Sequence, residues 1–168
     1  AEETSFTYAE LEGATLRHSS LRSAGLDYAH FKGAELSDVT LHGASMQHAE
    51  LTGISATDCN LSAVDLTSAS ATHSRFAGCT LEGANLHNAD FSHARFENTV
   101  LKHCDLRGAR FVGASFESSD LSGLDLRWAV FEKADFSRAG LSRCTLEGMH
   151  LEGGSFQGAD LEDALFTD

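Results

Sequence analysis

Two histidines and two arginines have types and spacing that could bind a ligand. His73 and His93 are each followed two positions later by an arginine, Arg75 and Arg95, and the two segments stand twenty positions apart. If positions twenty apart lie on neighbouring coils, the four side chains form one cationic corner. Such a corner would bind an anion or a partner's carboxylate, whereas its arginines would repel a metal cation. The sequence favours the alternative that the arginines form ordinary surface ion pairs with nearby acids such as Glu97.

Aromatic residues outside the apolar pattern form a second group that could contact a partner. Tyr8, Tyr28 and His48 share one column of positions twenty apart, and Trp128 falls further along it, next to Arg127. Outward Tyr and Trp side chains are frequent anchors of protein interfaces. For the tyrosines we expect a stabilising aromatic ladder. For Trp128, a partner contact together with Arg127 and a plain surface position both stay open.

Carboxylates form a third group. Asp65, Asp105 and Asp125, with Asn85 among them, share another such column. A row of charges at coil spacing is loosely comparable to the charge along a DNA strand. Arginines follow the last two acids by two positions and offset them, so a solvated polar surface is the alternative. The net charge of −13 argues against direct binding to nucleic acid or to an anionic membrane.

No grouping of residues predicts catalysis. The G-x-S-x-G, phosphate-loop and H-E-x-x-H motifs are absent, and the four cysteines include no C-x-x-C pair. Cys59 and Cys79 share a column, but side chains stacked in parallel make the torsion of a disulfide awkward. We therefore expect reduced thiols in a cytoplasmic protein, with no metal, no cofactor and no enzyme activity.

An unbroken five-residue repeat positions all of these side chains. From Phe6 to Phe166, every fifth residue is apolar: nineteen Leu, eleven Phe, one Met and two Ala. We call this position the centre. The residue two before it is small, most often Ala, and the position two after it holds 12 of the 15 glycines. Ala56 and Ala71 at centres predict a thinner core, and Ile54 beside Ala56 would restore part of the lost volume.

A period of five fits neither a helix nor a continuous strand, because neither would keep the centres on one face. The chain must therefore bend once in every repeat, with glycine where the turn needs a positive φ. Four such sides close one coil. Centres grouped by coil form a column of eight Leu, Leu21 to Leu161, and a run of five Phe, Phe76 to Phe156. The sequence predicts a single domain over residues 1–168, with about eight parallel coils.

Units such as Ala84-Asn85-Leu86, Ala89-Asp90-Phe91 and Ala134-Asp135-Phe136 resemble the A-(D/N)-L-x-x pattern of the pentapeptide-repeat family. The resemblance extends over residues 4–168 and implies an all-β fold, a right-handed quadrilateral parallel β-helix. Some members of that family resemble DNA in shape and charge and act on bacterial type II topoisomerase, giving quinolone resistance. Those members typically carry a C-terminal dimerisation helix, which this sequence does not show.

We therefore expect a non-enzymatic protein-interaction or scaffold module, alone or within a larger protein. The alternative is a DNA-mimicking regulator of a bacterial type II topoisomerase. The end coils predict a further contact, because an uncovered β-helix end leaves backbone and apolar side chains unpaired. Acids gather toward the C-terminal coil, so we expect contact between N-terminal ends, head-to-tail contact, or a flanking segment that caps the rod. The apolar centres of the first coil are Phe6, Leu11, Leu16 and Leu21.

Overall fold

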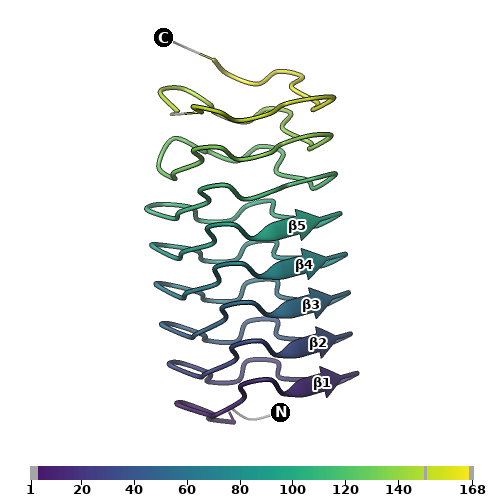
Figure 1. Ribbon diagram of the computed structural model, residues 1–168, viewed down its shortest axis with the longest axis vertical. Coiled ribbons are helices and arrows are strands. Elements are labelled where there is room, and N and C mark those ends of the chain that lie inside the picture. The colour runs from purple at the N-terminus through teal and green to yellow at the C-terminus, as the bar shows by residue number, and fades with distance from the viewer. Residues whose placement is uncertain (1–3, 150, 167–168) are drawn as a thin grey trace.

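The computed structural model describes residues 4–149 and 151–166, which form a rod of stacked four-sided coils (Figure 1). The fold is the right-handed quadrilateral β-helix expected from the repeat. We number the four sides of each coil in chain order. In one coil, Leu86, Phe91, Phe96 and Leu101 are the centres of sides 1, 2, 3 and 4.

Side 3 carries the regular strands of the described chain. They are β1 (Thr15–Arg17), β2 (Glu35–Ser37), β3 (Ser55–Thr57), β4 (Arg75–Ala77) and β5 (Arg95–Glu97). All pair in parallel in the order β1-β2-β3-β4-β5, each with the equivalent segment of the next coil. The regular sheet therefore spans four coil-to-coil steps, fewer than the eight coils expected. Isolated parallel bridges keep the same register on the other sides and as far as Thr145–Leu165.

Stacked phenylalanine rings fill the middle of the rod. On side 3, neighbouring ring centroids lie 5.0–5.2 Å apart along the column Phe76, Phe96, Phe116, Phe136 and Phe156. Side 2 adds a second column, Phe91, Phe111 and Phe131, with spacings of 5.0–5.4 Å. Burying one such ring contributes about 1.5–3 kcal/mol, so these columns are a main source of stability.

The corner residue, two after each centre, adopts a left-handed backbone. Twelve glycines have φ of 62–75°, and nineteen other residues have φ of 47–60°. At most corners the next inward amide donates to the centre's carbonyl, as Ala9 N does to Phe6 O at 2.9 Å, which makes a type II turn. The repeat assigned this conformation to glycine, yet His, Asp, Asn, Ser, Arg and Tyr residues also adopt it. Each does so at a cost of about 1–2 kcal/mol.

Corners after side 3 differ along the rod. In the coils of β1–β5, the inward residue after this corner is Ser19, Val39, Cys59, Cys79 or Thr99. None of their amides donates to the preceding centre's carbonyl, so these described turns are open. Side chains bond to backbone there instead, as when Ser19 Oγ donates to Arg17 O at 2.7 Å. Ser119 begins the closed turns: its amide donates to Phe116 O, and its buried hydroxyl accepts from Thr99 N, both at 3.0 Å.

The end coils bury their apolar centres less completely than the middle does. Phe6 is 38% exposed, and Leu165 and Phe166 at the other end are 57% and 60% exposed. The remaining centres of the first coil, Leu11, Leu16 and Leu21, are partly buried against the core. Across the described residues, no helix is long and apolar enough to cross a membrane.

Candidate functional site

One long edge of the rod carries every Tyr and Trp of the chain. Tyr8, Tyr28 and Trp128 are corner residues after side 1, each in a different coil. Their exposed fractions are 64%, 43% and 61%. Away from the end coils, Tyr28 and Trp128 are the large apolar residues that the described chain exposes. We call the line of corners through Tyr8, Tyr28, His48 and Trp128 the aromatic edge.

The first three rings of the aromatic edge stack on one another. The ring centroids of Tyr8 and Tyr28 are 5.1 Å apart, and those of Tyr28 and His48 are 4.8 Å apart. The planes of neighbouring rings differ by at most 17°. The sequence expectation of an aromatic ladder is therefore confirmed.

Trp128 breaks the backbone pattern that the other corners share. It is the one corner residue among those described whose φ is not positive. Its turn keeps a long hydrogen bond from Ala129 N to Leu126 O, at 3.3 Å, as a type I turn would. The turn change also moves the inter-coil bond, because Gly108 N donates to Trp128 O at 2.7 Å rather than to the carbonyl of Arg127.

Two further inter-coil hydrogen bonds are missing beside this corner. In the preceding coil Leu86 N donates to Asp105 O at 2.9 Å, but among the described residues no such bond joins Leu106 N to Asp125 O. The amide of Asp125 likewise makes no bond to the carbonyl of Cys104. On side 1, the Asp105–Asp125 step is the one bridge that is missing from the otherwise continuous described register between Ser5 and Leu165.

The side chain of Leu124 explains the gap. It occupies an inward position that holds Ala84 and Cys104 in the two preceding coils and Cys144 in the next. Leu124 is 3% exposed, so its extra volume lies in the core beside the full-sized centre Leu126. Packed interiors have no spare room for extra methylene groups, and backbone shifts relieve the strain.

A hollow of about 320 Å³ opens where the coils separate. It is lined by His103, Cys104, Asp105, Leu106, Arg107, Asp125 and Trp128. We call it the Trp128 notch. Cys104 is partly exposed, whereas the other three cysteines are buried. Desolvation raises the pKa of its thiol to about 12, so Cys104 is a neutral thiol at pH 7 and a poor nucleophile.

Charges around the notch pair with one another. Arg127 Nε and Nη2 donate to the two oxygens of Asp125 at 2.9 and 2.8 Å. Arg107 Nε donates to Asp105 Oδ1 at 2.9 Å. In each pair the guanidinium lowers the pKa of the carboxyl group. The guanidinium carbon of Arg127 also lies 5.8 Å from the centre of the Trp128 ring, within cation–π range.

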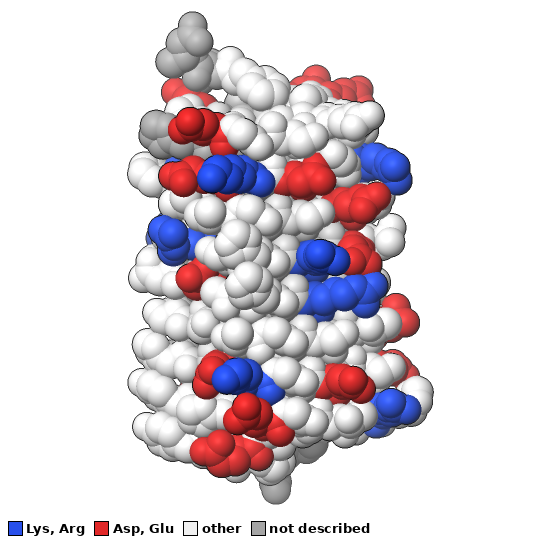
Figure 2. Space-filling model, viewed as in Figure 1, with Lys and Arg blue, Asp and Glu red and all other residues white. Residues whose placement is uncertain are grey.

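The predicted acidic column is not a row of free charges. Asp65, Asn85 and Asp105 are in register, but the column is interrupted before Asp125. One oxygen of Asp65 accepts bonds from the amide and hydroxyl of Thr67 at 2.9 and 2.6 Å. The other two acids are held by the arginines described above. On the face drawn in Figure 2, acidic and basic atoms are interspersed rather than gathered into one stripe.

The predicted histidine–arginine corner forms, on the edge between sides 2 and 3. The rings of His73 and His93 stack with centroids 4.9 Å apart. Arg75 makes two hydrogen bonds to Glu97, at 3.1 and 2.6 Å, as the ion-pair alternative expects. Arg95 makes no ion pair to any described acid. This corner lies on a different edge from Trp128, so the candidate residues form two separate surfaces.

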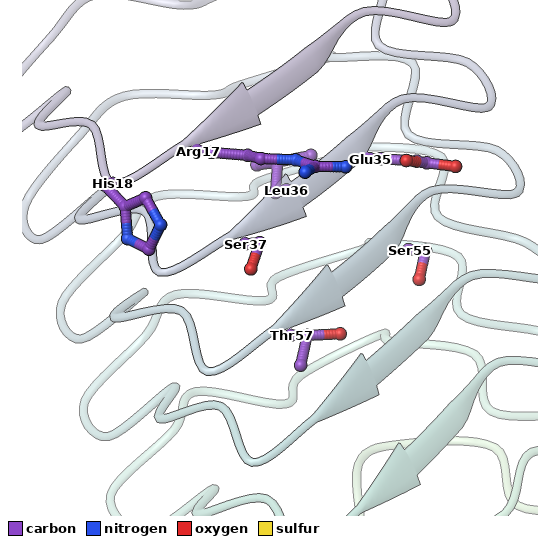
Figure 3. Close-up of a pocket in the computed structure, with 7 residues that line it drawn as sticks. All are labelled: Arg17, His18, Glu35, Leu36, Ser37, Ser55 and Thr57. Atoms are coloured by element: carbon purple, nitrogen blue, oxygen red, sulfur yellow. The ribbon is translucent and has the colours of Figure 1, made fainter.

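A second hollow, of about 290 Å³, lies over β1–β3 (Figure 3). It is lined by Arg17, His18, Glu35, Leu36, Ser37, Ser55 and Thr57. Arg17 lies across the strands and points toward Glu35 (Figure 3). His18 Nδ1 contacts Asp38 at 2.8 Å and makes no hydrogen bond to the lining hydroxyls in the described structure. The hollow therefore lacks the paired nucleophile and base of a covalent catalyst.

Within residues 4–149 and 151–166, no three His, Cys, Asp or Glu side chains are grouped to hold a metal ion. All four cysteines are free, including the stacked pair Cys59 and Cys79. Cys59 Sγ donates to Thr57 O at 3.3 Å, so this thiol takes part in the open corner of side 3.

Family models match most of the chain. The model described as pentapeptide repeat region matches residues 51–126 and 74–151, and the model described as pentapeptide repeats (8 copies) matches residues 19–55. The chain belongs to the pentapeptide repeat family. None of the curated proteins matches the sequence of this pentapeptide repeat protein.

Solved structures of pentapeptide repeat proteins are similar in fold. Full-length QnrB1, a plasmid-mediated fluoroquinolone resistance protein, matches at 18% identity and a TM-score of 0.59, over 98% of this chain and 90% of its own. A trypsin-treated QnrB1 variant matches at 22% identity and 0.57, over 94% and 77%. HetL from the cyanobacterium Nostoc sp. strain PCC 7120 is 26% identical over 96% of this chain and 89% of its own, with a TM-score of 0.32.

Sequence reasoning found Trp128 and Arg127 but missed the notch beside them. The available signal was Leu124, the one Leu at an inward position that is otherwise mostly Ala. A second signal was the pair Gly108 and Gly148, which flank Trp128 in its column and leave room for the indole. Neither signal alone indicates that the hydrogen-bonded register opens.

Proposed function

We propose that this pentapeptide repeat protein is a non-enzymatic module that binds a protein partner along the aromatic edge. The observation that carries the proposal is that the two tyrosines and the single tryptophan all lie on one of four edges. Large, rigid aromatic side chains supply contact area at a low cost in conformational entropy and dominate many interface energies. A Trp that is 61% exposed, with Arg127 beside it, has the composition of an interface anchor.

The remaining surface supports a binding role over an enzymatic one. The notch and the side 3 hollow are open and polar, and the described residues that line them include no nucleophile bonded to a base. The net charge of −13 argues against nucleic acid and anionic membranes as partners. The four free thiols favour a cytoplasmic location.

Site-specific photo-crosslinking tests the proposal. A benzophenone amino acid is placed at position 28, at 128, or at the matched corner Ala63 after side 4, and is irradiated in cells of the source organism. We expect one protein to crosslink from positions 28 and 128 but not from 63, and Arg127→Ala to reduce the yield from both. Equal crosslinking from all three corners would contradict a partner on the aromatic edge.

A second candidate is a DNA-mimicking regulator of a bacterial type II topoisomerase, which the high negative charge favours. The ion pairs of Asp105 and Asp125 weigh against it, because they neutralise part of the acidic column. A gyrase supercoiling assay decides the matter. Inhibition or quinolone protection at micromolar protein would support this candidate, and no effect would remove it.

The exposed end coils support a further contact, end-to-end association of the chain. Phe6 and the partly buried centres beside it offer apolar surface at the N-terminal end. Sedimentation equilibrium over a tenfold concentration range should show a reversible dimer, weakened by Phe6→Glu. A strictly monomeric species would refute this association.

A further inference from the structure

The Trp128 notch concentrates unpaired main-chain groups at one point of a surface that is otherwise regularly hydrogen-bonded. In the described structure the amides of Leu106 and Asp125 and the carbonyl of Cys104 lack the inter-coil partners that equivalent groups have one coil earlier. Backbone N–H and C=O groups withdrawn from water need partners. A ligand that supplies both an acceptor and a donor would complete this set.

Charge in the notch does not select an ion. Asp105 pairs with Arg107, and Asp125 pairs with Arg127, so each carboxylate already has a cation. An incoming anion would have to displace a carboxylate from its guanidinium, and an incoming cation would meet that guanidinium. The groups left free are main-chain dipoles, whose natural complement is another main chain.

The indole of Trp128 supplies the other half of the recognition surface. It forms one wall of the hollow, and the neighbouring corner, Gly108, adds no side chain. A volume of about 320 Å³ lies at the lower end of the range of small-ligand sites and is open on one side. It therefore fits a short stretch of chain passing through rather than an enclosed small molecule.

We propose that the notch binds an extended segment of the partner protein through main-chain hydrogen bonds, with one apolar or aromatic side chain of that segment against Trp128. This rests on the proposed function and names its mode of recognition. It is a local form of strand addition, in which unpaired backbone supplies affinity and a side-chain contact supplies specificity. The segment bonds to the Leu106 and Asp125 amides and the Cys104 carbonyl.

Selection from a phage library of random linear peptides without Trp tests the proposal. Each selected peptide is synthesised, and its affinity is measured by the fluorescence of Trp128, the single Trp of the chain. For variants that lack the indole, affinity is measured by calorimetry. The variants are Trp128→Ala, which removes the wall, and Leu124→Ala, which should let the coils close. Tyr28→Ala is the matched control, because it removes an exposed aromatic from the same edge outside the notch.

We expect binding to fall roughly tenfold or more in Trp128→Ala and Leu124→Ala, and to stay within about twofold in Tyr28→Ala. Methylating single backbone nitrogens of a selected peptide should abolish binding at one or two positions. Enrichment of no peptide, equal binding to all variants, or indifference to N-methylation would overturn the proposal. Crosslinking from positions 28 and 128 that persists despite such a result would leave the proposed function standing and reject only this mode of recognition.

Discussion

Two coils of the rod place a large aliphatic side chain at the small inward position, with opposite results. Ile54 sits beside the small centre Ala56, and the register around it is intact: Ser55 N donates to Ala34 O at 3.0 Å, and Arg75 N donates to Ile54 O at 2.8 Å. Leu124 sits beside a full-sized centre, and the bonds to the preceding coil are lost.

The difference shows that the core conserves volume within a coil rather than residue type at a position. Ala56 and Ile54 are both buried, with 0% and 3% exposure, so a large inward residue and a small centre exchange places. Around Leu124 no neighbouring centre is reduced, and the excess volume appears as a separation of coils. In this pentapeptide repeat, one uncompensated methyl-rich side chain is enough to create a surface feature.

The largest expected effect comes from moving the compensated arrangement to another coil. Phe116→Ala removes a fully buried ring from the side 3 column and should cost about 3–5 kcal/mol of unfolding free energy. Adding Ala114→Ile reproduces the pairing of Ile54 with Ala56 and should recover a substantial part of that loss. Denaturant unfolding measures both, with Glu117→Ala as a surface control within about 0.5 kcal/mol. No recovery in the double variant would show that compensation does not operate within a coil.

The reverse change should damage the compensated coil. Ala56→Phe beside Ile54 overfills it and should cost about 1–3 kcal/mol. The double change Ala56→Phe with Ile54→Ala should be less destabilised than Ala56→Phe alone. If Ala56→Phe instead stabilises the protein, a void remains at this coil and the comparison with Leu124 fails.

Leu124→Ala should cost less than burial alone indicates. Loss of a buried Leu typically costs about 2–5 kcal/mol, but closing the register restores main-chain bonds worth about 0.5–1.5 kcal/mol each. We expect a net loss below about 2 kcal/mol by denaturant unfolding. Leu126→Ala, a buried centre in the same coil, is the matched control and should show the full loss. Equal losses in the two variants would argue against strain at Leu124.

The smallest effect concerns acid. Arg107 lowers the pKa of Asp105, so the folded pKa lies below the unfolded one. The stabilisation is therefore present above the unfolded pKa and is lost as the pH falls through the folded pKa. Asp105→Asn should be less stable than the parent at pH 7 and equal to it near pH 2. Asp163→Asn, whose carboxylate lies 3.8 Å from Arg143, should show a smaller difference. An unchanged Asp105→Asn difference at both pH values would contradict the ion pair.

The sequence predicts the coil, its four sides and its stacking columns, because a strict five-residue period leaves the chain few ways to bury Leu and Phe. It also predicts that His73 stacks on His93 and Tyr8 on Tyr28, since equivalent positions of successive coils must coincide. It does not predict the open notch, because the repeat gives identities but not the sum of volumes in one coil. The left-handed φ of residues such as His93 and Arg138 also escapes a rule that looks for glycine.

Amide hydrogen exchange measured residue by residue by NMR tests the central claim, that the register opens beside Trp128. Leu106 and Asp125 are compared with Leu86 and Asp105, their equivalents one coil earlier, whose amides donate at 2.9 and 3.0 Å. We predict that the first pair exchanges roughly a hundredfold faster or more than the second, and that Leu124→Ala removes the difference. Equal protection of the two pairs in the unmodified protein would contradict the account.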